Sequence, residues 1–207
     1  MITDLKAQKG RGYVDVLTQA IRGGATVVQL RDQEASDETL IALGRALRKI
    51  CDHFGTLLIV NDRIDVAQAI DADGLHVGQN DMPLSEVKER LGSRKWVGIS
   101  THSLVQAKKA VEEGADYIGV GPVFKTPTKP GYPPVGVELV REVRSHLEIP
   151  FVAIGGIDLG NVKEVLLAGA DSVAVVRAVV GQDDICEAAR KFKTLLNKWP
   201  ETSGEEA

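Results

Sequence analysis

Acidic side chains follow two short apolar runs of the chain, where oxygen ligands can gather. Asp62 follows the run Leu57–Asn61, and Asp81 lies just beyond Gly74–Val77. Mg²⁺ prefers oxygen ligands, and it is commonly shared between one or two carboxylates, water and a substrate phosphate. We therefore expect Asp62 and Asp81 to bind Mg²⁺, the alternative being that each caps the helix that follows it.

A second candidate site is the pair Gly155-Gly156, which stands between an apolar run and a helical pattern. Glycine lets backbone N–H groups approach an anion at the start of a helix, so this pair predicts a phosphate site. A tight turn without a ligand is the alternative interpretation.

Two cations accompany these positions. Arg31 follows the run Ala25–Leu30, and Lys129 stands beside Thr126 and Thr128 in a stretch that holds five of the eight prolines. An arginine can grip an oxyanion with two donors, whereas a lysine offers a compact charge. Unless both are solvated surface charges, a metal, a phosphate site and two cations together predict a substrate that carries pyrophosphate.

The histidines give no clear catalytic arrangement. His102 follows Ser100 and is suited to acid–base chemistry, but a helix-entry residue or a hydrogen-bonded spacer explains it equally well. His76 alternates with Leu75 and Val77, which favours a place in the packed interior. The sequence predicts no Ser/His/Asp or Cys/His nucleophile.

Short Val- and Ile-rich runs alternate with longer segments of helical period, which indicates repeated βα units. We expect eight strands, the first of them a frayed or truncated one, at Met1–Thr3, Ala25–Leu30, Leu57–Asn61, Gly74–Val77, Trp96–Ile99, Tyr117–Val120, Pro150–Ile154 and Ser172–Val176. We expect eight helices at Val14–Arg22, Asp37–Phe54, Val66–Ile70, Leu84–Leu91, Leu104–Glu113, Val137–His146, Asn161–Leu167 and Ile185–Lys198.

A weak repeat of Gly, Ala and Asp precedes several strands, as in Gly114-Ala115-Asp116 and Gly169-Ala170-Asp171. Glycine there ends the preceding helix and lets the chain turn into the next strand. Eight such units predict an α/β fold, a compact (β/α)₈ TIM barrel, whose active site is built from the loops at the carboxyl ends of the strands. An open doubly wound sheet is the alternative, but its Gly-rich dinucleotide motif is missing.

The composition fits one domain. The chain has 207 residues, of which 4% are aromatic, so its core must consist mainly of small and branched aliphatic side chains. We expect a single domain over residues 1–199 and a disordered tail over 200–207. The proline-rich stretch between the sixth predicted strand and the next helix predicts a functional loop.

Charge and apolar patterning exclude several partners. A net charge of −4 leaves no basic face for nucleic acid, and no apolar run approaches the roughly 20 residues of a membrane span. Cys51 and Cys186 lack metal-site spacing and read as reduced thiols. We expect a soluble cytoplasmic protein, and a homo-oligomer is left open.

Seven segments in order resemble the thiamine phosphate synthase family and together span nearly the whole chain. They are Gln29-Leu30-Arg31, Asn61-Asp62-Arg63, residues 72–81, Gly98-Ile99-Ser100, residues 114–124, Thr126-Pro127-Thr128-Lys129 and Ala153-Ile154-Gly155-Gly156-Ile157.

The resemblance implies a (β/α)₈ barrel that joins a pyrimidine diphosphate to a thiazole phosphate, or its carboxylated form, and releases pyrophosphate. It implies Mg²⁺ as the cofactor, on Asp62 and Asp81, with Arg31, Ser100 and Lys129 catalytic. The pyrimidine diphosphate would contact Gln29, Arg31, Gln33, Asn61, Ser100 and Lys129. The thiazole phosphate would contact Thr126, Thr128, Gly156, Val176 and Arg177.

Two positions depart from the family pattern. Many members carry Lys where Gln33 stands and Ser where Arg177 stands. Two other functions compete: the related thiazole tautomerase, with a histidine near His102, and a non-catalytic sensor of phosphate ligands. Retention of Asp62 and Asp81 favours the synthase, because a tautomerase releases no pyrophosphate.

Overall fold

The computed structural model describes residues 1–4, 6–128 and 131–202, in which seven parallel strands form one sheet. The strands follow one another around the sheet in chain order, each hydrogen-bonded to the next. They are β1 (Val27–Leu30), β2 (Leu57–Asn61), β3 (Gly74–Val77), β4 (Trp96–Thr101), β5 (Tyr117–Val120), β6 (Phe151–Ile154) and β7 (Val173–Ala174). The predicted α/β fold with parallel strands is confirmed.

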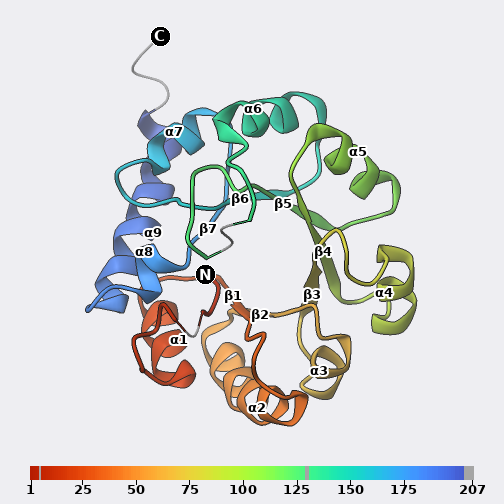
Figure 1. Ribbon diagram of the computed structural model, residues 1–207. Coiled ribbons are helices and arrows are strands. Elements are labelled where there is room, and N and C mark those ends of the chain that lie inside the picture. Colours follow the sequence, from red (N-terminus) through yellow and green to blue (C-terminus); the bar gives the residue numbers. More distant parts are fainter. Residues whose placement is uncertain (5, 129–130, 203–207) are drawn as a thin grey trace.

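Helices surround the strands on the outside (Figure 1). They are α1 (Tyr13–Arg22), α2 (Asp37–Phe54), α3 (Ile64–Ala69), α4 (Leu84–Leu91), α5 (Leu104–Glu112), α6 (Gly136–His146), α7 (Val162–Leu167), α8 (Arg177–Val180) and α9 (Ile185–Thr202). The first and last long helices, α1 and α9, lie side by side. No helix in the described part of the chain is both long and apolar enough to cross a membrane.

The N-terminal residues extend the hydrogen bonding of β1. Ile2 makes a parallel bridge with Gln29, and the backbone N–H of Thr3 donates to the carbonyl of Gln29 at 3.0 Å. The Ile2 N–H donates to the carbonyl of Val175, just beyond β7, at 3.2 Å. The expected first strand, Met1–Thr3, is thus an isolated bridge in contact with both ends of the sheet.

The core consists mainly of aliphatic side chains, as the low aromatic content predicted. Leu58, Ile59 and Val60 of β2 are consecutive and all buried. Three buried neighbours on one strand require cover on both faces, which is characteristic of parallel sheets between helices and an inner core.

In two of the repeats that precede a strand, the aspartate ties one βα unit to its neighbour. The Asp73 carboxylate accepts the Leu58 N–H at 2.7 Å and pairs with Arg48 at 2.6 Å. Asp116 does the same two units later, accepting the Val97 N–H at 2.8 Å and pairing with Lys88 at 3.3 Å. Each aspartate therefore links a neighbouring strand to a cation on a nearby helix.

Several predicted boundaries need correction near the C-terminus. The expected strand Ser172–Val176 contains only Val173–Ala174, and the short helix α8 (Arg177–Val180) follows, which the sequence interpretation missed. Val179 and Val180 belong to this helix and are buried. Their apolar character therefore reflects a buried helix and not a strand. Helix α9 continues to Thr202, and residues 203–207 of the expected tail lie outside the described residues.

Candidate active site

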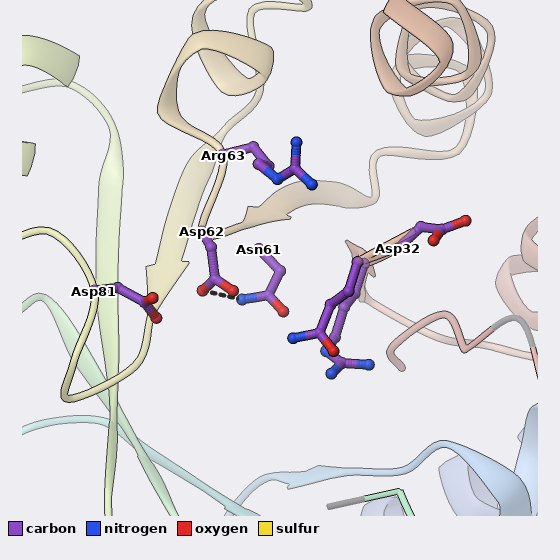
Figure 2. A pocket seen from close by; sticks show the side chains of 7 residues that line it. Asp32, Asn61, Asp62, Arg63 and Asp81 are labelled. Atoms are coloured by element: carbon purple, nitrogen blue, oxygen red, sulfur yellow. Dashed lines mark hydrogen bonds between the residues drawn. The ribbon is translucent and has the colours of Figure 1, made fainter. Parts of the chain in front are cut away.

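A polar pocket of about 300 Å³ lies at the carboxyl ends of β1 and β2 and beside the loop after β3 (Figure 2). Its lining residues are Arg31, Asp32, Gln33, Asn61, Asp62, Arg63 and Asp81. Five of them belong to the predicted site, namely Arg31, Gln33, Asn61, Asp62 and Asp81. The structure therefore brings together side chains that are up to fifty residues apart in sequence.

A tight turn at the end of β2 aims the side chains of this pocket. Asp62 has φ +62°, a left-handed conformation that is uncommon for a residue with a Cβ. Its N–H donates to the carbonyl of His76 at 2.9 Å, and the Arg63 N–H donates to the Asn61 carbonyl at 2.7 Å. The amide of Asn61 donates to the Asp62 carboxylate at 2.5 Å and to the His76 carbonyl at 3.1 Å.

Asp81 belongs to the loop after β3, where its carboxylate accepts the Gly78 N–H at 2.7 Å. The carboxylates of Asp62 and Asp81 point toward the same part of the pocket, whereas Asp32 extends away from them (Figure 2). Neither Asp62 nor Asp81 is a helix cap, because Arg63 and Pro83 hold the N-cap positions of α3 and α4. The capping alternative is therefore wrong for both residues.

The carboxylate pair fits Mg²⁺ better than a metal enclosed by protein ligands. Among the described residues no group of three or more His, Cys, Asp or Glu side chains is arranged to hold a metal. Mg²⁺ needs only one or two carboxylates when water and substrate phosphates complete its shell. The donor set of Asp62 and Asp81 has the right chemistry for that role.

Arg31 is anchored through both its backbone and its side chain. Its N–H donates to the hydroxyl of Thr3 at 2.7 Å, and this hydroxyl donates back to the Arg31 carbonyl at 2.8 Å. The guanidinium lies 3.9 Å from the Asp4 carboxylate, and the Arg31 side chain is 14% exposed. Its buried Nε has no hydrogen-bond partner within the described residues, and Gln29 lies buried two residues earlier.

The loop that carries Gln33 is held by Asp32. The Asp32 carboxylate accepts the Tyr13 hydroxyl at 2.6 Å and the N–H groups of Glu34 and Ala35 at 2.9 and 3.1 Å. Burial opposes the charge of Asp32, but these hydrogen bonds and the charge of Arg31 outweigh burial and lower its pKa. Burial and the bond to Asp32 raise the pKa of Tyr13, so the phenol stays protonated.

Ser100 at the end of β4 lies outside this pocket lining and joins a hydrogen-bonded group inside the sheet. Its hydroxyl lies 3.0 Å from Nε2 of His76, and Nδ1 of His76 lies 3.0 Å from the hydroxyl of Tyr117. Gln79 donates to the Ser100 carbonyl at 2.7 Å. The sequence interpretation of His76 as a packed interior residue missed this polar role, which depends on the register of three strands.

His102 acts as a hydrogen-bonded spacer in the described structure. Its Nδ1 lies 2.5 Å from the Gly121 carbonyl, and its ring lies 4.7 Å from that of Tyr132. Helix α5 is capped by Ser103 instead. The interpretation of His102 as a hydrogen-bonded spacer is therefore favoured over its interpretation as an acid–base residue.

The predicted thiazole-phosphate residues come from three loops. Thr126 accepts the Thr128 N–H at 3.3 Å, and Lys129 lies outside the described residues. Gly156 has φ +66°, and a Cβ there would lie 2.6 Å from the Lys125 carbonyl, so only glycine lets the loops after β5 and β6 meet. Val176 is the N-cap of α8, and Arg177 is its exposed first residue.

Comparisons with known proteins show the family to which the chain belongs. Residues 1–179 match the family model described as thiamine monophosphate synthase. The thiamine-phosphate synthase of Chloroflexus aurantiacus is 48% identical over 95% of this chain and 91% of that protein. That of Shouchella clausii is 46% identical over 95% of each chain.

A solved structure shares the fold over nearly the full length. The thiamine phosphate pyrophosphorylase from Pyrococcus furiosus superposes with a TM-score of 0.88 at 36% identity, covering 96% of this chain and 94% of that one. With this agreement in sequence, length and fold, the chain belongs to the thiamine monophosphate synthase family.

Proposed function

We propose that this chain joins a pyrimidine diphosphate to a thiazole phosphate and releases pyrophosphate, forming thiamine phosphate. The observation that carries the proposal is the pocket at the ends of β1–β3, which combines two guanidinium groups with carboxylates that suit Mg²⁺. Family membership supports the same reaction.

The proposed framework is a closed (β/α)₈ barrel. Its support is the position of Ile2, which bridges to Gln29 of β1 and donates to the Val175 carbonyl beyond β7. In such a barrel the loops after the strands share one face, where substrates bind.

Asp62 and Asp81 would hold Mg²⁺ in the synthase. When bound, the ion supplies positive charge that offsets the negative charge developing on the leaving diphosphate. Asn61 supports Asp62 by donating its amide to that carboxylate, and Gly78 supports Asp81 through its N–H.

The polar side chains near the pocket would bind the pyrimidine diphosphate. Arg31 and Lys129 supply positive charge, while Gln29, Gln33, Asn61 and Ser100 supply neutral hydrogen bonds. Because Arg31 is already fixed by Thr3 and Asp4, it needs little rearrangement as charge develops. Preorganised donors of this kind are commonly the largest contribution to catalysis.

The thiazole phosphate would be held by Thr126, Thr128, Gly156, Val176 and Arg177. The close approach of Gly156 to Lys125 supports this grouping. The bond between the pyrimidine methylene carbon and the diphosphate oxygen breaks first, and its electron pair leaves with pyrophosphate. The lone pair of the thiazole nitrogen then captures the carbocation that remains, which the pyrimidine ring stabilises. This substitution requires no nucleophile from the protein.

The proposal also covers the cellular location and the oligomeric state. Phosphorylated substrates do not cross membranes readily, so the cytoplasm, where such compounds are made, is the proposed location. A homo-oligomer is tested by light scattering of the purified chain.

The deciding experiment incubates the purified chain with both substrates and Mg²⁺ and measures thiamine phosphate and pyrophosphate. We expect both products in equal amounts, and their loss when a chelator removes the metal. Proton exchange on the thiazole without pyrophosphate would indicate a tautomerase, and binding of both substrates without turnover would indicate a sensor. Either result would overturn the proposal.

A further inference from the structure

Arg63 provides a second guanidinium to the polar pocket, in addition to that of Arg31. It lies next to Asp62 in sequence and lines the pocket together with it. The sequence places Arg63 at the end of a strand but assigns it no role. Arg63 thus brings a positive charge to the pocket that holds Asp62 and Asp81.

The acidic partners of both pocket cations lie outside the pocket lining. In the described part of the chain Arg31 pairs with Asp4, and Arg63 pairs with Asp37 through Nη1 at 2.5 Å. The pocket carboxylate Asp32 is instead satisfied by the neutral donors Tyr13, Glu34 and Ala35. Among the described residues, the acidic partner of each pocket guanidinium thus lies outside the pocket lining, and Asp32 takes its hydrogen bonds from neutral donors.

The turn at Asp62 separates the two kinds of group. Because Asp62 has φ +62°, successive side chains leave the backbone in different directions. Asp62 points toward the side of Asp81, and the Arg63 side chain extends over the other side of Asn61 (Figure 2). One turn therefore presents a carboxylate and a guanidinium to different parts of one ligand.

Asp37 holds the Arg63 side chain without burying it. Asp37 is the first residue of α2, and the side chains of Arg63 and Asp37 are 37% and 43% exposed. An ion pair with this exposure contributes little to stability, so tethering α2 is a weak reason for it. A guanidinium carries five N–H donors, and the bond to Asp37 leaves donors for an oxyanion.

Resting on the function proposed above, we propose that Arg63 binds the diphosphate of the pyrimidine substrate and the pyrophosphate that is released. Asp37 is a positioning residue that keeps the guanidinium at the pocket before the anion arrives. Arg31 and Arg63 then approach the diphosphate from the ends of β1 and β2, and Gln33, which lines the same pocket, contributes neutral donors.

The test measures binding of inorganic pyrophosphate by calorimetry, with and without Mg²⁺. Arg63→Gln should weaken binding at least tenfold in both conditions. Arg63→Lys, which keeps the charge but loses the planar fork, should weaken it about threefold. Arg141→Gln is the matched control, because Arg141 pairs with Glu138 on the exposed face of α6. This variant should bind pyrophosphate as tightly as the wild type.

Kinetics separate binding from a structural role. In Arg63→Gln the KM for the pyrimidine diphosphate should rise by the same factor, and the KM for the thiazole phosphate should stay within twofold. Asp37→Ala should raise the first KM a few-fold, and Asp37→Asn should restore it. In the Arg63→Gln background Asp37→Ala should have no further effect, because the group it positions is gone.

Each outcome decides the inference. Pyrophosphate affinity within twofold of the wild type in both Arg63 variants would overturn it, as would equal rises in both KM values together with a lower melting temperature. If the wild type forms no thiamine phosphate but Arg63→Gln still loses pyrophosphate affinity, the proposed function fails and the diphosphate site stands.

Discussion

Asp81 is the residue whose substitution should best distinguish an effect on catalysis from an effect on folding stability. Its side chain is exposed and, among the described residues, makes one hydrogen bond, which it accepts from the Gly78 N–H. Asp81→Ala should therefore change the melting temperature little, while turnover should fall more than about 100-fold, because even supporting groups around a metal commonly cost 10–100-fold. Pyrophosphate release and thermal unfolding measure the two effects.

Asp183→Ala is the control for that substitution, because the Asp183 side chain is 99% exposed and pairs only at the surface with Lys9. It should match the wild type in both measurements. Near wild-type turnover in Asp81→Ala would contradict the metal assignment.

The bond between Tyr13 and Asp32 predicts a pH-dependent stability. Tyr13→Phe removes the hydroxyl that helps to lower the pKa of Asp32. A lowered pKa stabilises the folded state above the unfolded value near 3.9, and this contribution is lost as the pH falls through the folded pKa. The variant should be about 1 kcal/mol less stable at pH 7, and the difference should shrink below about pH 4.

Denaturant unfolding of Tyr13→Phe and the wild type at pH 7 and pH 3 tests this sign. A stability difference that grows in acid would show that Asp32 is not the group concerned. The partial exposure of the pair keeps the expected difference below the usual range of about 1.5–3 kcal/mol for a hydrogen bond to a charged group.

The residues of the pocket were predictable where strand ends carry them. Arg31, Asn61 and Asp62 close apolar runs, and the ends of parallel strands meet at one face. The roles of Arg63 and His76 were not predictable in this way. They depend on the left-handed turn at Asp62 and on strand register, which place Asn61 opposite His76 and Gly98 opposite Tyr117.

At the scale of elements, the contact of α1 with α9 depends on a glycine. A Cβ at Gly23 would lie 2.3 Å from the Cys186 carbonyl and 2.6 Å from the Ala189 Cβ. Gly23→Ala should therefore force the two helices apart and cost about 1–3 kcal/mol, the usual range for overpacking. Denaturant unfolding measures this loss.

Gly12→Ala is the matched comparison, because it precedes the same helix with φ −70° and nothing lies within 4 Å of its added Cβ. It should leave stability unchanged or raise it slightly. Equal effects of the two substitutions would contradict the packing argument.

Most helices and strands could be predicted from the hydrophobic period of the sequence. The exception is the region of β7 and α8, and it has a physical cause. Helix α2 was predicted at Asp37–Phe54 and found there, because its apolar stripe runs through five turns. The stretch from Ser172 to Val180 is too short for a period to develop, and its valines suit a strand or a buried helix equally. Tertiary packing therefore decides that β7 stops at Ala174 and α8 begins at Arg177.

At the scale of the whole molecule, the parallel order of strands could be predicted because each unit repeats the same turn from helix to strand. How the first and last units meet could not, because that contact depends on three N-terminal residues with no period of their own. Thr3 is the polar residue at this meeting point, and it is fully buried.

Thr3→Val tests whether this contact supports both the fold and the pocket. Valine keeps the shape of threonine but removes the hydroxyl that bonds the N–H and the carbonyl of Arg31 at 2.7 and 2.8 Å. Two partly buried backbone groups lose their partner, so we expect a loss of about 2–4 kcal/mol in unfolding free energy. Because Arg31 lines the pocket, pyrophosphate affinity should fall as well.

Hydrogen exchange locates the effect. The amides of Ile2, Thr3 and Gln29, which join the N-terminal residues to β1 and to Val175, should exchange faster in Thr3→Val, whereas those of β4 and β5 should keep their protection. Thr18→Val removes a hydroxyl that bonds the Val14 carbonyl on the exposed side of α1, and it should change neither stability nor exchange at these sites. If Thr3→Val were as stable as Thr18→Val, the N-terminal residues would not hold the two ends of the sheet together.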